Sequence, residues 1–298
     1  MSLFDRIVVG AMPLVPRVVV ERVASRYVAG ESLTAAIETV RKLNGESTMA
    51  TLDVLGEEVT DDAQAAVTVD EYCEALQTIR DEGLDSNVSV KLTALGLHAD
   101  EERCTEQLAR IVDVAAQVGS FVRMDMEDHT CTDATLGIYR KLRERYENVG
   151  VVLQAMLHRT PQDIRELLPL SPNVRLCKGI YREPAEIAHQ HPSDVRQAYV
   201  ECMNLLLEGG AYVGLATHDE VLIEAALQSL ERLTLPREGY EFQMLLGVLP
   251  SLRRRLIAAR HRLRVYVPYG ADWYAYSMRR LRENPTVAKH VMLAFFKR

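Results

Sequence analysis

The stretch that decides the fold lies between residues 87 and 127, and reads NVSVKLT (87–93), EERCTEQLARIVDVAAQV (101–118) and FVRMDME (121–127). The first and third pieces are short β-rich runs. The middle piece has the length and apolar spacing of an amphipathic helix. A strand, a helix and a second strand in this order predict a βαβ unit with two parallel strands. The same alternation continues along most of the chain.

Eight β-rich runs are predicted as strands: Thr48–Leu55, Asn87–Thr93, Phe121–Glu127, Gly150–Met156, Asn173–Lys178, Tyr212–Thr217, Tyr240–Leu246 and Leu263–Val267. The helices between them are predicted at Val69–Glu82, Glu101–Val118, Asp133–Glu147, Pro161–Leu167, Ser193–Glu208, Glu220–Leu233 and Pro250–Arg260, with a final helix after Asp272. Eight strands, each followed by a helix, predict an α/β fold of the (β/α)8 TIM-barrel type. A doubly wound sheet is the second choice, because no Gly-x-Gly-x-x-Gly turn follows the first strand.

Two further helices are predicted ahead of the first strand, at Arg17–Val28 and Ser32–Leu43. No linker rich in Pro, Gly or Ser divides the chain. We therefore expect residues 1–45 to form extra N-terminal helices that pack on a barrel made by residues 46–298.

Composition narrows the class of protein. The chain has 298 residues, a formal charge of −7 and 48% apolar residues, which is typical of a globular protein and disfavours nucleic acid as a partner. Five scattered cysteines without a Cys-x-x-Cys pair indicate reduced thiols and no zinc site. The sequence contains no run of about 18 uncharged apolar residues, which is the pattern that predicts a transmembrane helix. We expect a cytoplasmic protein, with peripheral contact at the inner membrane as the alternative.

Polar residues stand at or near the end of every predicted strand: Asp53, Lys91, Asp125, Gln154, Arg175 with Lys178, Thr217 with His218, Gln243, and Tyr266. A single residue of this kind is more often part of a structural ion pair. In a barrel, however, the strand ends meet at one mouth, where active sites lie. Because buried polar groups cost stability unless something binds them, eight such positions predict a binding site at this mouth.

The final predicted helix carries a second polar group. Tyr276, Arg279, Arg280 and Glu283 are spaced to share one helix face. Two adjacent arginines beside a phenol and a carboxylate are suited to hold a small carboxylate ligand. A solvated basic helix face explains the same spacing, and this segment alone leaves both readings open.

Several chemistries can be compared on the residues. Metal catalysis is disfavoured by the lack of a His-Glu-x-x-His motif, and a serine hydrolase by the lack of Gly-x-Ser-x-Gly. Lys91 on a strand keeps a Schiff-base aldolase open. Arg175, Lys178 and Gly179 form a cationic corner suited to a phosphate or to the electron-rich edge of a redox cofactor. A barrel that only binds amino acids is the non-enzymatic alternative.

Seven short blocks, in order and with barrel spacing, resemble the proline dehydrogenase family in its short monofunctional bacterial form. The blocks are Val90–Thr93, Asp125–Asp128, Val174–Gly179 with Tyr181 after it, Ala216–Asp219, Phe242–Gly247, Tyr266–Gly270 and Tyr276–Glu283. The resemblance implies a distorted barrel that binds FAD without a covalent bond. It also implies oxidation of L-proline to 1-pyrroline-5-carboxylate, with the electrons passed to a membrane quinone. Because the chain lacks the aldehyde dehydrogenase segment of the fused bacterial forms, we expect a separate pyrroline-5-carboxylate dehydrogenase to take the product.

The resemblance assigns two sets of residues. The first, here called the substrate group, contains Lys91, Asp125, Leu245, Tyr266, Tyr276, Arg279, Arg280 and Glu283. Within it, Arg279 and Arg280 would hold the proline carboxylate, with Lys91 beside that carboxylate and Glu283 paired with the arginines. Tyr276 and Leu245 would form walls for the ring. Tyr266 would face its far side, and Asp125 would hold Tyr266.

The second set, here called the cofactor group, contains Gln154, Arg175, Lys178, Gly179, Tyr181, Thr217, His218 and Gln243. In the family pattern, Arg175 would lie against the flavin nitrogen that accepts the hydride. The other members would bind the remaining parts of FAD. The Lys91 aldolase remains the alternative function.

Overall fold

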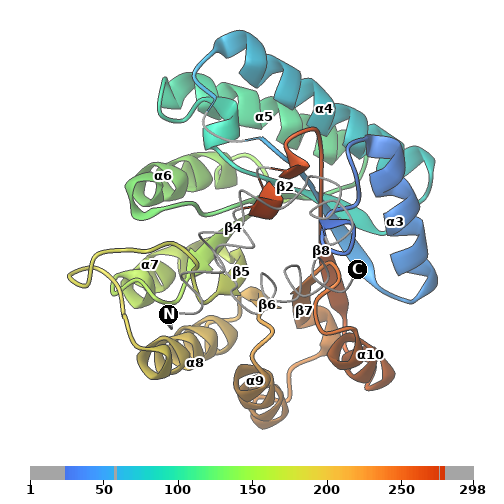
Figure 1. The fold of residues 1–298 in the computed structure, drawn as a ribbon. Coiled ribbons are helices and arrows are strands. Elements are labelled where there is room, and N and C mark those ends of the chain that lie inside the picture. The colour runs from blue at the N-terminus through green and yellow to red at the C-terminus, as the bar shows by residue number, and fades with distance from the viewer. Residues whose placement is uncertain (1–23, 57–58, 275, 279–298) are drawn as a thin grey trace, which may run out of the picture.

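The structure is a computed structural model that describes residues 24–56, 59–274 and 276–278. Eight parallel strands close a barrel in sequence order, with helices around it (Figure 1). The strands are β1 (Met49–Val54), β2 (Ser86–Val90), β3 (Val122–Met124), β4 (Val149–Gln154), β5 (Asn173–Cys177), β6 (Tyr212–Ala216), β7 (Tyr240–Leu245) and β8 (Leu263–Tyr269). The predicted (β/α)8 fold is confirmed.

Pairing of β8 with β1 closes the barrel. The register runs from Met49 opposite Arg264 to Val54 opposite Tyr269. Strand β8 therefore continues beyond Val267, the end expected from the sequence. The extension contains Pro268, which has no N–H to donate. It is tolerated because the outward hydrogen bond at this position is made by its carbonyl, which accepts the Ala29 N–H at 2.9 Å.

The helices described are α3 (Leu33–Gly45), α4 (Asp62–Asp81), α5 (Glu101–Gln117), α6 (Thr132–Arg143), α7 (Thr160–Leu167), α8 (Pro192–Glu208), α9 (Glu220–Arg232) and α10 (Pro250–Ala258). The interstrand helices occur where the sequence predicted them. Helix α4 begins at Asp62 rather than Val69, because the Asp61 carboxylate accepts the Ala63 N–H at 2.8 Å and caps the earlier start. Within the described ranges, no helix has both the length and the apolar content needed to cross a membrane.

Helix α3 takes the place of an eighth outer helix. Its buried residues, Ala36, Ile37, Val40 and Leu43, pack against β1 and β8, and in Figure 1 it lies between α4 and α10 in the outer ring. In a regular barrel the helix after the last strand covers this groove. The groove between β8 and β1 is therefore already covered by a helix that precedes β1.

Residues 24–31, here called the N-terminal strap, lie across the end of β8. The Gly30 carbonyl accepts the Gly270 N–H at 3.0 Å, and Glu31 accepts a hydrogen bond from the Trp273 indole. Most of the helix predicted at Arg17–Val28 lies outside the described residues. The division of the chain at residue 45 stays a prediction for the same reason.

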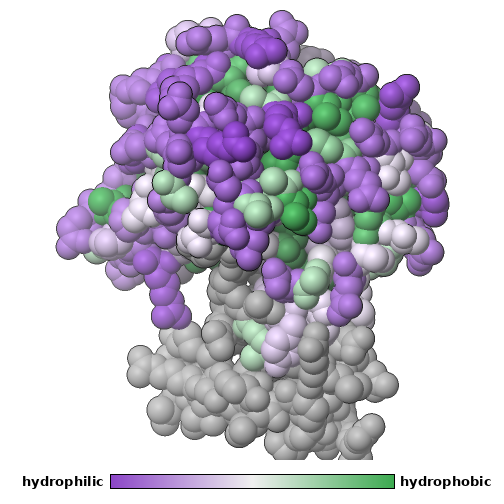
Figure 2. Space-filling view, turned by 90° about the horizontal axis from the view of Figure 1, so that it is seen from above, coloured by the Kyte–Doolittle hydropathy of each residue, from purple (hydrophilic) through white to green (hydrophobic). Residues whose placement is uncertain are grey.

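Apolar and polar residues alternate along the strands. One set, which includes Leu52, Val90, Met124 and Phe242, joins the helices in one hydrophobic core. The other set is polar and buried, and includes Asp53, Ser89, Arg175 and Gln243. The hydrophobic layer therefore lies between strands and helices, and the barrel interior is polar. The outer face seen in Figure 2 is mostly hydrophilic, with hydrophobic residues in small groups.

A buried ion pair lies inside the barrel below the mouth. Glu241 accepts hydrogen bonds from Arg264 at 2.7 Å, Tyr212 at 2.8 Å and Gln243 at 2.6 Å. Burial alone would raise the pKa of Glu241, but the Arg264 charge and these hydrogen bonds hold it at about 2. Glu241 is therefore a carboxylate whose acceptor capacity is fully used.

We expect Glu241→Gln to lower the free energy of unfolding by about 3 kcal/mol, because it leaves Arg264 without a buried counter-charge and points an amide at other donors. Thermal unfolding followed by circular dichroism measures this. The matched control is Glu208→Gln, which removes a surface pair with Arg232 and should cost less than about 1 kcal/mol. Equal losses in the two variants would contradict this account of the interior.

Candidate active site

A cavity of about 670 Å³ opens at the carboxyl ends of the strands. It gathers residues of both groups predicted from the sequence. From the substrate group, Lys91, Asp125, Leu245 and Tyr266 line it. From the cofactor group, Gln154, Arg175, Lys178, Gly179, Tyr181, Thr217, His218 and Gln243 line it. The strand-end reading of the sequence thus found one shared site, although the role of each residue stays a prediction.

The rest of the substrate group belongs to the segment after β8. Tyr276 is buried, is not among the residues lining the cavity, and donates its backbone N–H to the Asp272 carbonyl at 3.1 Å. Helical structure begins at Trp273. Arg279, Arg280 and Glu283 lie outside the described residues, so their positions stay predictions.

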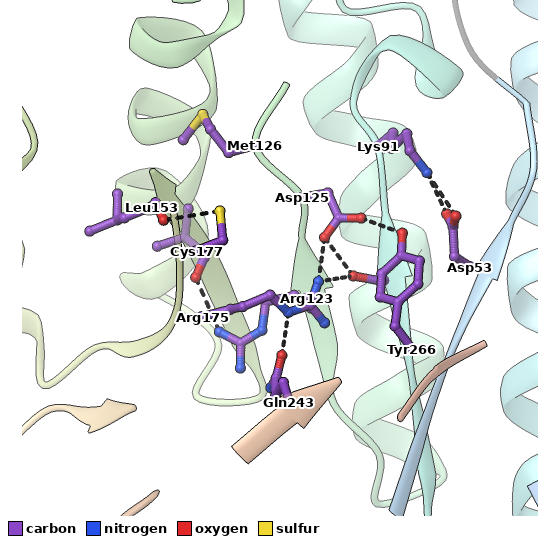
Figure 3. A network of polar contacts seen from close by, with 12 residues as sticks. Asp53, Lys91, Arg123, Asp125, Met126, Leu153, Arg175, Cys177, Gln243 and Tyr266 are labelled. Carbon is purple, nitrogen blue, oxygen red and sulfur yellow. Dashed lines mark hydrogen bonds and ion pairs between the residues drawn. The ribbon is translucent and has the colours of Figure 1, made fainter. Parts of the chain in front are cut away.

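Asp125 is the centre of a buried network (Figure 3). One carboxylate oxygen accepts from Arg175 at 2.6 Å and from Ser89 at 2.7 Å. The other accepts from the Tyr266 hydroxyl at 2.8 Å. Arg175 also lies 5.2 Å from the centre of the Tyr266 ring. Asp125 therefore links the cofactor group to the substrate group.

The protonation of Tyr266 follows from this arrangement. Burial, and next the nearby Asp125 charge, raise the pKa of the Tyr266 hydroxyl well above its ordinary value. The phenol stays protonated near neutral pH and keeps its proton directed at Asp125. The network thus presents a fixed aromatic ring to the cavity.

Lys91 forms an ion pair that the sequence did not assign. Its Nζ lies 2.7 and 2.8 Å from the two carboxylate oxygens of Asp53, which is fully buried on β1 (Figure 3). Burial raises the pKa of Asp53, and the Lys91 charge acts against that rise. The sequence signal for Asp53 was its place near the end of the first strand. Its partner could only be found once β1 and β2 were paired.

The cofactor side has two features that fit a bound group. Gln154 donates its amide N–H to the Glu127 carbonyl at 2.9 Å, and its Oε1 is buried without a hydrogen-bond partner in the described part of the chain. Gly179 has a φ of +104°, and a Cβ there would overlap Met156. Both lie at the cavity. The unused acceptor of Gln154 suits a bound ligand, and the lack of a side chain at Gly179 lets the loop pack against Met156.

Residues that the sequence reading missed complete the rim. Asp219 accepts from Lys178 at 3.2 Å and from Arg196 at 2.8 Å, and all three line the cavity. Glu127, also on the cavity, accepts from the Thr93 backbone and hydroxyl. Glu127 and Asp219 stood inside matched sequence blocks. Arg196 had no sequence signal, because it lies near the start of a helix rather than at a strand end.

His218 is held as a neutral imidazole. Its Nε2 accepts the Leu245 N–H at 3.0 Å, so this nitrogen carries no proton. Burial, and next the Lys178 charge, lower the pKa of His218 to about 4. A cation at this position would lose the hydrogen bond and meet Lys178.

Comparison with known proteins identifies the family. The sequence model of the proline dehydrogenase family matches residues 36–292. Proline dehydrogenase 1 of Bacillus subtilis (strain 168) is 38% identical over 275 residues, covering 92% of this chain and 91% of that protein. Proline dehydrogenase of Deinococcus radiodurans is 37% identical over 279 residues, covering 92% and 90%.

A solved structure gives the same result. Proline utilization A (PutA) from Bdellovibrio bacteriovorus, inactivated by N-propargylglycine, superposes with a TM-score of 0.83 at 25% identity. The match covers 89% of this chain and 33% of that chain, so this chain spans about a third of that protein.

Fold and site together define an enzyme with a (β/α)8 barrel whose cavity lies at the carboxyl ends of the strands. The family match covers most of the chain, and the two bacterial relatives align over nearly their whole length. The chain belongs to the proline dehydrogenase family, whose members are oxidoreductases that act on proline.

We expect the protein to lose stability as the pH falls from 7 to 5, in part because the unfolded chain protonates histidine near pH 6.5 while folded His218 resists protonation down to about pH 4. The pKa of His218 is lower in the folded protein than in the unfolded chain. Its contribution to the free energy of unfolding is therefore fully present above pH 6.5 and is lost as the pH falls. The contribution of His218 is about 2 kcal/mol over this range.

His218→Gln keeps an acceptor for the Leu245 N–H and has no titrating group. Its melting temperature should therefore change less between pH 7 and pH 5 than that of the wild type. Parallel profiles for the two proteins would refute the assignment to His218.

Proposed function

We propose that this protein oxidises L-proline to 1-pyrroline-5-carboxylate with FAD bound in the cavity. The observation that carries the proposal is the position of Asp125, which bonds at once to Arg175 of the cofactor group and Tyr266 of the substrate group. A redox cofactor and its substrate must lie in contact, and this carboxylate joins the two halves of the cavity that would hold them.

The cofactor side suits a flavin nucleotide. Gln154 offers an unused buried acceptor, and Gly179, which lines the cavity, is packed closely against Met156. Lys178, beside Arg196, gives a cationic corner for phosphate oxygens. Arg175, held by Asp125 and Gln243, is a fixed cation that would stabilise negative charge on a reduced ring. When bound, FAD would accept the hydride from proline.

The substrate side suits a small amino acid. We assign the carboxylate of proline to Arg279 and Arg280, with Lys91 as a further cation, and the apolar ring to Leu245 and Tyr266. The assignments of Arg279 and Arg280 rest on the sequence resemblance. The support for Leu245, Tyr266 and Lys91 is their shared position on one cavity.

Hydride leaves from the ring carbon next to nitrogen, while the nitrogen gives up a proton, so that a C=N bond forms. This requires the neutral amine. Cations gathered near the carboxylate would lower the pKa of the bound ammonium group and favour that form. The fixed rings and ion pairs of the site would hold proline in one orientation, which is a large part of what such a site contributes to the rate.

The Lys91 aldolase is not favoured. A Schiff-base lysine must reach its neutral form, whereas Lys91 is bonded to both oxygens of Asp53. That reading also gives Arg175 and Asp125 no joint role.

We propose a membrane quinone as the acceptor of the two electrons, which places the protein in the cytoplasm with peripheral contact at the inner membrane. The product would then pass to a separate pyrroline-5-carboxylate dehydrogenase. Both partners are inferred from the resemblance alone.

The first test is the visible spectrum of the purified protein before and after anaerobic addition of L-proline. We expect flavin bands at roughly 380 and 450 nm, and loss of the longer-wavelength band as proline is oxidised. Persistent bands would indicate another amine substrate. A colourless protein that takes up no added FAD, and that borohydride links to a carbonyl substrate, would instead support the aldolase.

Gly179→Ala should lower the affinity for FAD at least tenfold, because alanine is strained at a φ of +104° and its Cβ would displace Met156. The flavin bound per protein after dialysis measures this. Gly137→Ala is the control: this helical glycine has open space around it, so the change should leave FAD binding intact and raise stability by about 0.5–1 kcal/mol. Unchanged FAD binding in Gly179→Ala would remove this loop from the cofactor site.

A further inference from the structure

The connection between β5 and α8, residues 178–191, is long and has no helix, yet it supplies Lys178, Gly179, Ile180 and Tyr181 to the cavity. Loops of this length in compact domains are usually functional. Two of these residues are exposed apolar side chains, Ile180 at 47% and Tyr181 at 36%. Burial of these two side chains therefore contributes little to holding this part of the loop.

Both ends of the loop are fixed by backbone bonds to the chain after β4. The Lys178 carbonyl accepts the Met156 N–H at 2.9 Å, and the Met156 carbonyl accepts the His189 N–H at 2.8 Å. Ala188 packs with Met156 and Leu157 in a small apolar cluster. Within the loop, the Pro184 carbonyl accepts the Ile187 and Ala188 N–H groups, and the Glu186 carbonyl lies 3.3 Å from Nδ1 of His158.

Glu183 is the buried side chain of residues 180–186, with 2% of its side chain exposed. One carboxylate oxygen accepts the backbone N–H of His129 at 3.0 Å, and the other contacts Nδ1 of the same histidine at 2.5 Å. The Glu183 carbonyl accepts from the Gln190 amide at 3.2 Å, which ties it to the far end of its own loop. A buried carboxylate with both oxygens on one residue is a directional contact.

The partner belongs to the wall of the cavity. His129 begins the short helical turn that follows Asp125, Met126 and Glu127, all of which line the cavity. Gln154 at the end of β4 bonds to the Met126 and Glu127 carbonyls. The contact of Glu183 with His129 therefore adds a direct link between the segments that follow β3 and β5, which are each also bonded to the end of β4.

We propose that Glu183 is a positioning residue that clamps the loop of residues 178–191 to His129 and so holds Gly179 and Tyr181 in place for the cofactor. This rests on the proposed binding of FAD in the cavity. Glu183 does not line the cavity and acts only through the residues it fixes.

The test compares three variants of the full-length protein. Glu183→Ala removes the clamp. Glu183→Gln keeps an oxygen for the His129 N–H and an amide for the imidazole. Glu186→Ala is the matched control, an exposed carboxylate on the same loop. Hydrogen–deuterium exchange of residues 178–191 is measured without FAD, and the Kd for FAD is measured by quenching of flavin fluorescence.

Glu183→Ala should raise exchange in this loop and weaken FAD binding about 10- to 100-fold, as expected for the loss of a hydrogen bond to a charged group. Glu183→Gln should recover most of the affinity, and Glu186→Ala should match the wild type. Unchanged exchange and Kd in Glu183→Ala would overturn the clamp. So would a lower melting temperature with an unchanged Kd, which is the signature of a merely structural role.

The two proposals fail in different ways. A wild-type protein that binds no FAD overturns the cofactor site and the clamp's role in it. A wild-type protein that binds FAD, with a Glu183→Ala variant that binds it equally well, overturns only the clamp.

Discussion

The structure depends on the neutrality of a crowded polar interior. On the strands and at the mouth of the barrel, the buried carboxylates are those of Asp53, Asp125, Glu127 and Glu241, and the buried cations are Lys91, Arg123, Arg175 and Arg264. An isolated charge in such a place would cost several kcal/mol, so each needs a counter-charge or a full set of hydrogen bonds. Arg123 depends on hydrogen bonds to the Asn173 backbone and side chain, although its Nε has no hydrogen-bond partner in the described part of the chain, and burial lowers its pKa to about 9.

Four of these charges, on Arg264, Glu241, Arg175 and Asp125, belong to one connected series of hydrogen bonds. Arg264 binds Glu241, Glu241 accepts from Gln243, and Gln243 accepts from Arg175. Arg175 then reaches Asp125 and Tyr266 at the cavity. Each hydrogen bond fixes the two side chains that it joins, so the side chains at the mouth are already oriented before any ligand arrives. Such preorganisation is what an electrostatic site requires, and the barrel supplies it by using its interior for polar contacts.

The sequence predicted the parts of this arrangement that are local. A β-rich run that ends in a polar residue identifies Lys91, Arg175 and Gln243 without knowledge of their partners, because strand ends of a parallel barrel share one face. The partners themselves are not local. Asp53 meets Lys91 only after β1 and β2 pair, and Glu183 meets His129 across 54 residues. Arg196 lies near the start of helix α8, so the rule that strand-end residues meet at the barrel mouth could not identify it.

The position of α3 shows that the packing partners of a whole helix, like those of a single residue, cannot be predicted from its local sequence. Its apolar stripe predicted that it packs on the protein, but nothing in that stripe selects the groove between β8 and β1 over any other. Once α3 fills that groove, no helix from after β8 is required to cover it. The N-terminal strap instead bonds to Gly270 and Trp273, which directs the start of the last helix from the end of β8, at the face where the cavity opens. A helix from before β1 thus covers the groove that the last helix covers in a regular barrel, and the described residues after β8 begin at the end of the barrel where the strap bonds to them.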